Sequence, residues 1–249
     1  MTTYRTIAAG VAALALTSVG AQAPMRFQGT MRYASVPPTL PLSNTDVTAS
    51  NRKIAMAYGA LDQMWQADFR RIGQRFVTPG IARYRGSAYT QCGPMPSGNA
   101  VYCPNTNTIY YDEIFIAAMA KMASNALGTD GDMASVGVIA HEMGHAVAMQ
   151  LGYSSPYSYE NESVADCLAG AFAQQSRKDG SLEKGDEEEA FWGMASAADP
   201  TPRPTGNVRY DRAIARRMAV MGHGTRAQRM GNFKAGLDGG AGACLEEFR

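Results

Sequence analysis

Two histidines and a glutamate form the most reactive short motif in this sequence. His141, Glu142 and His145 occur in the order His-Glu-x-x-His, although the 249 residues contain only three histidines. Helix positions four residues apart share a face, so both imidazoles can bind one metal ion. Glu142 is turned by about 100° from the first histidine, where it can act as general base for an attacking water. The motif therefore predicts a single Zn²⁺ ion held by His141 and His145.

The residues around the motif favour this interpretation. Nearly every position from 133 to 149 is apolar or small, which indicates a helix buried on all sides. Histidines and a glutamate inside such a helix are costly unless they share a partner. The alternative is that both histidines are hydrogen-bonded core residues and that Glu142 is solvated.

A catalytic zinc ion needs a third protein ligand, and the helix expected to follow the motif offers one. Glu162 and Asp166 lie four residues apart, so one carboxylate can bind the metal while the other supports a ligand. We prefer Glu162 as the ligand, with Asp166 accepting the second N–H of a zinc histidine. Glu160 competes for the ligand role, and a solvated acidic face is the alternative for the whole segment.

Hydrophobic periodicity indicates an α+β, mainly helical fold with a small β-sheet or hairpin. We expect a strand at 81–85 and a hairpin over 100–111, after which Asp112 caps a helix. The acids at 186–189 are interpreted as the first turn of a helix, favoured by its dipole, and not as a binding site. The other helices are expected at 46–71, 132–151, 158–177, 208–221 and 225–237.

The first 21 residues predict a secretory signal. Arg5 precedes an apolar stretch at 7–19, and small residues at 19–21 fit a cleavage site. An uncleaved N-terminal anchor is the alternative. A proline-rich linker at 22–45 then leads to a single folded domain at 46–249, which would carry the metal site. The net charge of +1 favours neither nucleic acid nor an acidic membrane as partner, so we expect no membrane contact beyond a possible N-terminal anchor.

Four cysteines in an exported chain, either periplasmic or secreted, suggest two disulfides. Cys92 and Cys103 are close in sequence and enclose a segment rich in glycine and proline. Their pairing leaves Cys167 with Cys244, which would tie a central helix to the C-terminus. A structural zinc site is the weaker alternative, because the sequence contains no Cys-x-x-Cys spacing.

The segments 138–145, 162–170 and 223–229 resemble the putative neutral zinc metallopeptidase family of bacteria. The resemblance implies a zincin-like fold with a central His-Glu-x-x-His helix and a glutamate ligand on the next helix. It implies Glu162 as the third zinc ligand and Asp166 as the partner of a zinc histidine. The short loop at 153–159 departs from the family and bears on substrate preference. Ala146-Val147 also departs, and further matches lie at 91–93, 102–104 and 131–134.

A peptide or protein substrate is expected mainly from this resemblance, since a fold alone does not fix a substrate. In the expected mechanism, Glu142 takes a proton from the attacking water and passes it to the leaving amine. His223 is the candidate donor to the oxyanion, although its neighbours Gly222 and Gly224 also fit a helix cap or a packed turn. An extended substrate could pair with the edge of the hairpin ending at Tyr111. The alternatives are a catalytically inactive zinc-binding scaffold that recognises a peptide or cell-wall component, and a zinc hydrolase acting on another amide.

Overall fold

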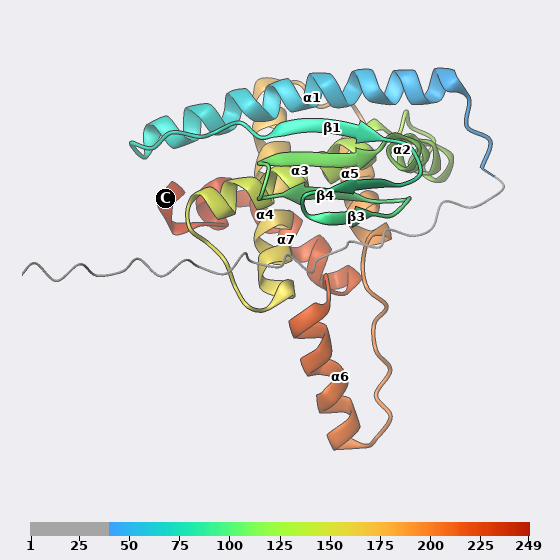
Figure 1. The fold of residues 1–249 in the computed structure, drawn as a ribbon, viewed down its shortest axis with the longest axis vertical. Coiled ribbons are helices and arrows are strands. Elements are labelled where there is room, and N and C mark those ends of the chain that lie inside the picture. The colour runs from blue at the N-terminus through green and yellow to red at the C-terminus, as the bar shows by residue number, and fades with distance from the viewer. Residues whose placement is uncertain (1–39) are drawn as a thin grey trace, which may run out of the picture.

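A computed structural model describes residues 40–249, which form seven α-helices and a small sheet (Figure 1). The expected signal at 1–21 and residues 22–39 of the expected linker lie outside these residues, and the first helix begins at Asn44, inside the expected linker. The α+β, mainly helical class is confirmed. The helices are α1 (Asn44–Arg71), α2 (Glu113–Leu127), α3 (Asp132–Gln150), α4 (Ser158–Asp179), α5 (Asp186–Ser196), α6 (Val208–Met221) and α7 (Arg226–Gly239), followed by short 3-10 turns at Ala241–Ala243 and Glu246–Phe248.

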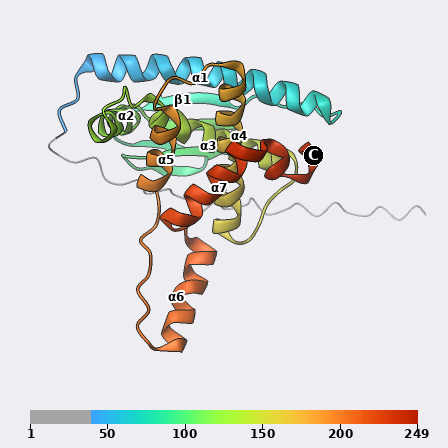
Figure 2. The same cartoon turned by 180° about the vertical axis from the view of Figure 1, so that it is seen from behind.

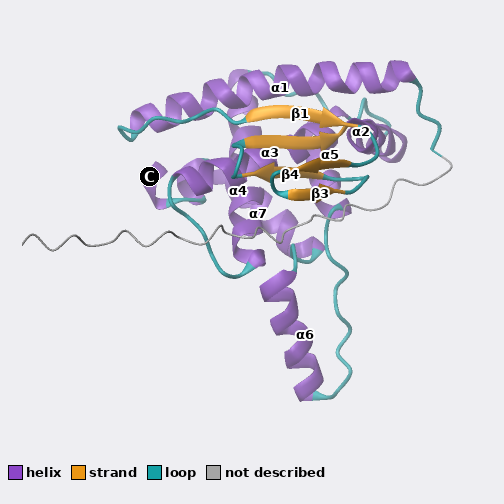
Figure 3. Ribbon diagram, in the orientation of Figure 1, coloured by secondary structure: helices purple, strands orange, loops and turns teal. Residues whose placement is uncertain are grey.

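The main sheet has three strands, and the hairpin expected from the sequence supplies two of them (Figure 3). β5 (Thr108–Asp112) is central, with β4 (Ala100–Cys103) antiparallel on one side and β1 (Gly80–Tyr84) parallel on the other. The sequence predicted β1 as a strand but not its parallel pairing. A separate ribbon of β2 (Ala88–Thr90) and β3 (Gly93–Met95) was not predicted. The strand ending near Tyr111 is therefore paired on both sides, and the free edge of the hairpin belongs to β4.

α3 runs through the core of the molecule. Every residue from Met133 to Ala148 is buried, as expected for a helix that is apolar on all sides. Its neighbours are α1, α2, α4 and α5, and β4 also contacts it. The His-Glu-x-x-His motif is thus enclosed by protein, and the surrounding elements decide which groups reach it.

Side-chain caps explain where three of the helices begin. Ser43 caps α1, which begins at Asn44, two residues before the expected start. Asp112 accepts a hydrogen bond from the backbone N–H of Ile114 and caps α2 as expected. Thr225 caps α7 through a capping box. Each cap satisfies backbone N–H groups that the first helical turn leaves without a partner.

α7 crosses α4 with their backbones in contact, on the face seen in Figure 2. A Cβ atom added to Gly170 would lie 1.9 Å from the carbonyl oxygen of Phe233, and one added to Gly236 would lie 1.8 Å from that of Cys167. No side chain fits at either glycine. The spacing of the two helices is therefore set by backbone contact, which fixes how residues of α7 approach α4.

Both expected disulfides are present. Cys92 is bonded to Cys103, and Cys167 is bonded to Cys244. The first joins the β2–β3 ribbon to the end of β4, and the second joins α4 to the segment after α7. Among residues 40–249, no helix is both long enough and apolar enough to cross a membrane.

α6 projects away from the rest of the molecule as an arm, together with the extended segment that leads to it (Figures 1 and 3). Asn207 caps its first turn, and none of its residues is buried. The helix was expected from periodicity, but its separation from the core was not. The arm therefore contributes little to the packing that positions the motif.

Candidate metal centre

The two motif histidines meet Glu162 between α3 and α4. His141 Nε2 lies 3.1 Å from Oε2 of Glu162, and His145 Nε2 lies 3.5 Å from Oε1. The two imidazole rings are nearly perpendicular, with centroids 4.7 Å apart. All three side chains are buried, and their ligand atoms lie within 4.8 Å of one another. The structure therefore brings together the three residues that the sequence analysis selected as metal ligands.

Gly144, inside the motif, allows this approach. A Cβ atom at this position would lie 2.9 Å from the carbonyl oxygen and 3.0 Å from the Cα atom of Ala165. Any side chain would push α4 away from α3. The glycine thus holds the helices close enough for the Glu162 carboxylate to reach both imidazoles.

The atoms that face one another in this cluster fit a cation. Asp166 Oδ1 lies 2.8 Å from His141 Nδ1, and because a carboxylate only accepts, the proton of the neutral ring belongs on Nδ1. The lone pair of Nε2 then faces the carboxylate of Glu162. Within the described chain, His141 Nε2 and Glu162 Oε2 are buried and form no hydrogen bond. Two buried acceptors at this distance need a positive charge between them.

Electrostatics in the metal-free protein lead to the same conclusion. Burial lowers the pKa of His141, but the nearby carboxylates of Asp166 and Glu162 outweigh it and raise the pKa to about 9. Burial raises the pKa of Glu162, but His145 and His141 outweigh it and hold that pKa well below its usual range. The site thus favours a carboxylate and a positive charge beside it, which a proton or a metal ion can supply.

Arg229, on α7, holds the Asp166 carboxylate in place, and the sequence did not predict this contact. It is fully buried, and it donates from Nε to Asp166 Oδ2 at 3.0 Å and from Nη2 to Asp166 Oδ1 at 2.5 Å. A further N–H donates to the carbonyl oxygen of Ala197. The guanidinium outweighs burial and lowers the pKa of Asp166. Arg229 lies in a matching family segment, but its contact across 63 residues has no local signal.

Glu142 lies beside the cluster and is held by the edge of the sheet. Its Oε2 atom accepts a hydrogen bond of 2.7 Å from the backbone N–H of Tyr102 in β4, and the side chain is buried. In an antiparallel pair, alternate N–H groups point away from the partner strand. The N–H of Tyr102 is such an outward group, so the free edge of β4 faces the motif helix.

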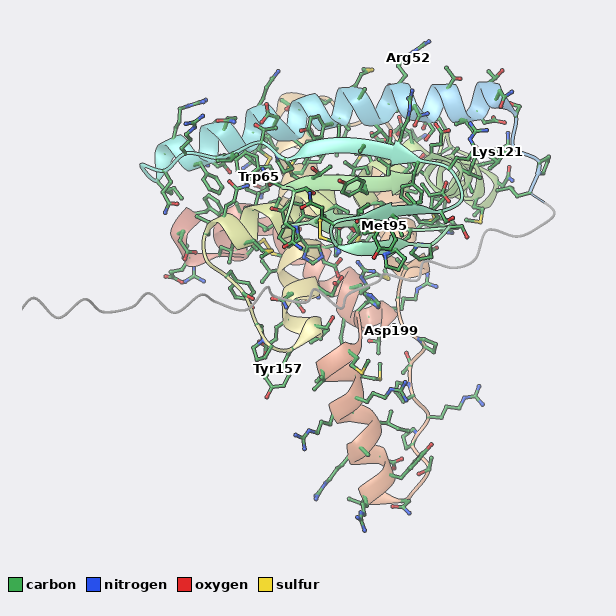
Figure 4. All side chains as sticks on the ribbon, in the orientation of Figure 1. Arg52, Trp65, Met95, Lys121, Tyr157 and Asp199 are labelled. Carbon is green, nitrogen blue, oxygen red and sulfur yellow. A yellow bond between two sulfur atoms is a disulfide. The ribbon has the colours of Figure 1, made fainter. Side chains whose placement is uncertain are left out.

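His223 lies in the turn before α7, outside the His-His-Glu cluster. Asp199, labelled in Figure 4, accepts hydrogen bonds from the backbone N–H groups of His223 and Gly224 at 2.6 and 3.2 Å. The Asp199 carboxylate also lies 3.4 Å from His223 Nδ1. His223 Nε2 is buried and has no hydrogen-bond partner within residues 40–249. A Cβ atom at Gly224 would lie 3.5 Å from Cγ of Arg229, so this turn packs next to the support of the cluster.

Glu160, the competing ligand candidate, points elsewhere. It is exposed, and it accepts a hydrogen bond from the hydroxyl of Ser155 at 2.5 Å. Asp166 contacts His141, one of the two histidines considered for that partnership. Asp199, which contacts His223, and Arg229, which contacts Asp166, were not identified from the sequence.

Comparison with known proteins places the chain in a family. The profile of a family described as "Putative neutral zinc metallopeptidase" matches residues 39–248. The chain belongs to this family. The resemblance identified from three short segments is thereby confirmed over nearly the whole described chain. All the residues of the candidate metal centre fall within the match.

Proteins similar to this member of the zinc metallopeptidase family occur in bacteria. The chain is 31% identical to the uncharacterized protein YpfJ of Escherichia coli K12 over 223 residues, covering 82% of this chain and 73% of that protein. It is 26% identical to the uncharacterized protein Rv2575 of Mycobacterium tuberculosis H37Rv over 193 residues, covering 70% of this chain and 63% of that protein. No solved structure matches the chain.

Proposed function

We propose that this protein is a zinc-dependent endopeptidase, with His141, His145 and Glu162 as ligands of one zinc ion and Glu142 as general base. The observation that carries the proposal is the buried pair of acceptors, His141 Nε2 and Glu162 Oε2, with His145 beside them. Two imidazoles and one carboxylate are a ligand set of catalytic zinc sites that keep one position open. Membership of a zinc metallopeptidase family supports the same choice of ion.

Zinc held by these residues would supply a Lewis acid that polarises a substrate carbonyl and acidifies a water. The protein's own contribution begins with Glu142, whose carboxylate is fixed by the Tyr102 amide. It accepts the proton of the attacking water and returns it to the leaving amine. Asp166 keeps the His141 ring in the tautomer with Nδ1 protonated, and Arg229 holds Asp166 in its ionised form.

The free edge of β4 is the proposed substrate platform. A peptide extended along this edge would add a strand to the sheet, with its carbonyl groups accepting from outward N–H groups of β4. The outward N–H of Tyr102 already donates to Glu142, so a peptide paired with the neighbouring outward N–H groups would have its scissile bond next to the general base. Recognition of this kind depends on the main chain of the substrate, so it favours peptides over unrelated amides.

His223 is the proposed donor to the oxyanion. Asp199 anchors its main chain and lies next to Nδ1, where the carboxylate can only accept a hydrogen bond. With both ring nitrogens protonated, Nδ1–H would donate to Asp199 and the buried Nε2–H would donate to a developing negative charge. The 3.4 Å contact would orient the ring for this role.

Export to an oxidising compartment is also part of the proposal. The two disulfides indicate an extracellular or periplasmic location, since such bonds are rare in the reducing cytosol. Cleavage of the N-terminal segment after Ala21 would release a mature chain that begins at Gln22. N-terminal sequencing of the exported protein tests this: a chain that retains Met1 would indicate an anchor instead.

The decisive experiment compares wild type with Glu142→Gln on a mixed peptide library, each with one zinc equivalent and with the metal chelated. We expect zinc-dependent cleavage by wild type, and a fall in kcat of about 10²- to 10⁴-fold in the variant. Elemental analysis should find one zinc per chain in both proteins. Glu160→Gln is the matched control, because it removes the charge of an exposed glutamate on α4.

The outcomes separate the rival functions. Unchanged cleavage by Glu142→Gln would contradict the proposed mechanism. Absence of cleavage by zinc-loaded wild type would favour a zinc-binding scaffold. Cleavage confined to cell-wall cross-links, with no linear peptide cut, would favour a hydrolase of another amide.

A further inference from the structure

Four carboxylates gather at the opposite end of α3 from the loop before α4, away from the zinc ligands in sequence. Asp130 and Asp132 lie at the start of α3, and Asp186 and Glu189 lie in the first turn of α5. One carboxylate oxygen from each lies within 4.8 Å of the others. Four carboxylate oxygens gathered this closely can bind one hard cation such as calcium, which takes oxygen ligands at about 2.3–2.6 Å.

Glu189 is part of the scaffold of this cluster. It is fully buried, and its two oxygens accept hydrogen bonds of 2.8 Å from the backbone N–H groups of Gly131 and Met133. It thereby caps α3, whose N-cap residue Gly131 has no side chain to do so. The same contacts fix the end of α3 against α5. Each oxygen keeps a second lone pair available to a cation.

Asp186 supplies the independent sign of a ligand. The residue is only 5% exposed. Its Oδ2 atom accepts a hydrogen bond from the backbone N–H of Glu183, but Oδ1 is buried and has no hydrogen-bond partner in the described structure. A buried carboxylate oxygen without a donor is costly. Its neighbours in the cluster are other carboxylates, which accept and cannot donate when ionised.

The single lysine at the cluster neutralises only part of this charge. Lys53 on α1 lies 2.5 Å from Asp132 and 3.6 Å from Asp130, and its side chain is 42% exposed. Within residues 40–249 it is the one basic residue that forms an ion pair with any of the four acids. One ammonium thus faces four carboxyl groups. Burial, with the neighbouring acids adding to it, raises the pKa of Asp186 to about 6 in the cation-free protein.

We propose that Asp130, Asp132, Asp186 and Glu189 form a structural calcium site that clamps the first turn of α3 to the first turn of α5. The ligands are all oxygen and come from two helix starts, which suits a hard cation that tolerates irregular geometry. Zinc would favour the imidazole-containing cluster instead. The acids at 186–189 lie in the first turn of α5, as the sequence predicted. The sequence did not show that Asp186 and Glu189 meet Asp130 and Asp132.

This site would stabilise the fold and take no part in the reaction. Asp132 and His141 are nine residues apart on one helix, which corresponds to about 13 Å of rise. A cation at the start of α3 would hold the helix between α2 and α5 and so steady the motif in its middle. The proposal does not depend on peptidase activity, because its readouts are calcium binding and thermal stability.

The test uses the purified chain, stripped of metals, reloaded with one zinc equivalent and titrated with CaCl₂. We expect calorimetry to detect one calcium site, and calcium at 100-fold above its Kd to raise Tm by about 5–10 °C. Asp186→Asn should abolish that rise. The variant should also melt at a higher temperature than wild type in chelator, because it removes a buried, uncompensated charge. Glu188→Gln is the matched control, since Glu188 is exposed in the same helical turn.

Two results would overturn the proposal. One is a Tm that does not respond to millimolar calcium in the zinc-loaded wild type, which would leave Lys53 as the sole counter-ion. The other is an equal response to magnesium at the same concentration, which would contradict the assignment to calcium. If Asp186→Asn does not fold, Asp130→Asn provides the second variant, because this exposed ligand can change without disturbing the core, and it should weaken calcium binding.

Discussion

α3 contributes to two groups of charged residues, one fully buried and one partly exposed, and their charges are compensated differently. At the His-His-Glu cluster in its middle, the outer carboxylate, Asp166, is neutralised by the buried Arg229, so the protein itself completes that layer. At its first turn, four acids face one half-exposed lysine, Lys53. The first group carries its own outer counter-charge, whereas in the second group one ammonium faces four carboxyl groups.

The difference shows what each group is suited to do. A cluster whose outer layer is rigid and neutral can orient ligands and control a proton, as catalysis requires. A cluster that is held by backbone N–H groups on one side and open to solvent on the other can gain stability from a bound ion. If this comparison is correct, changes at one cluster should leave the characteristic readout of the other intact.

Glu162→Ala should produce the largest effect. Removing a ligand should reduce zinc content from one equivalent toward zero and lower peptide cleavage by more than the roughly 10- to 100-fold typical of losing a residue that supports a ligand. The calcium-dependent rise in Tm should persist. Full zinc occupancy in this variant, measured by elemental analysis, would show that Glu162 is not the third ligand.

Arg229→Met should cost about 3–5 kcal/mol of unfolding free energy, because it leaves the buried Asp166 carboxylate without its partner. Zinc affinity should fall as well. Arg177→Met is the control: Arg177 forms an exposed ion pair with Glu187, worth at most about 1 kcal/mol. Denaturant unfolding of both variants measures the contrast, and equal losses would mean that Arg229 has no special role.

His223→Ala should lower kcat by about 10²- to 10³-fold, the usual cost of removing an oxyanion donor. Zinc content and the calcium response should not change. Steady-state kinetics with a fluorogenic peptide provides the measurement. A variant that raises KM while keeping kcat would show that His223 binds substrate or shapes the turn instead.

Gly236→Ala should cost about 1–3 kcal/mol, because its Cβ atom would collide with the backbone of α4. Gly231→Ala, in the same helix but with no atom within 4 Å of its added Cβ, should gain about 0.5–1 kcal/mol. Thermal melts of the pair test whether backbone contact sets the position of α7. Displacement of α7 should weaken zinc binding through Arg229 and spare the calcium response.

Local patterns were sufficient for most of the elements and for selecting the three residues that meet between α3 and α4. The motif at 141–145 and the pair Glu162 and Asp166 have the spacing of helical neighbours, so a linear sequence contains the signal directly. The cap Asp112 and both disulfides were likewise predicted from residue type and proximity, whereas the cap Ser43 was not. The structure brings these residues together where expected.

Long-range contacts could not be predicted in this way. Arg229 meets Asp166 across 63 residues, and Glu189 meets Met133 across 56 residues, so neither pair has a periodic signature. The parallel pairing of β1 with β5 also depends on the path of the chain between them. The acids at 186–189 were assigned correctly to a helix start, but burial by a distant segment changes what they can bind.

The two disulfides have a practical consequence for anyone who assays this protein. Cys103 follows Tyr102, whose amide holds Glu142, and Cys167 follows Asp166, which contacts His141. Each bridge thus begins one residue from a group at the candidate metal centre. Thiol reductants added to preserve a preparation would remove both crosslinks and lower the stability of the fold that holds these groups, because a crosslink restricts the unfolded chain. Activity assays therefore need a buffer without thiol reductants, so that a negative result is obtained on the disulfide-bonded protein.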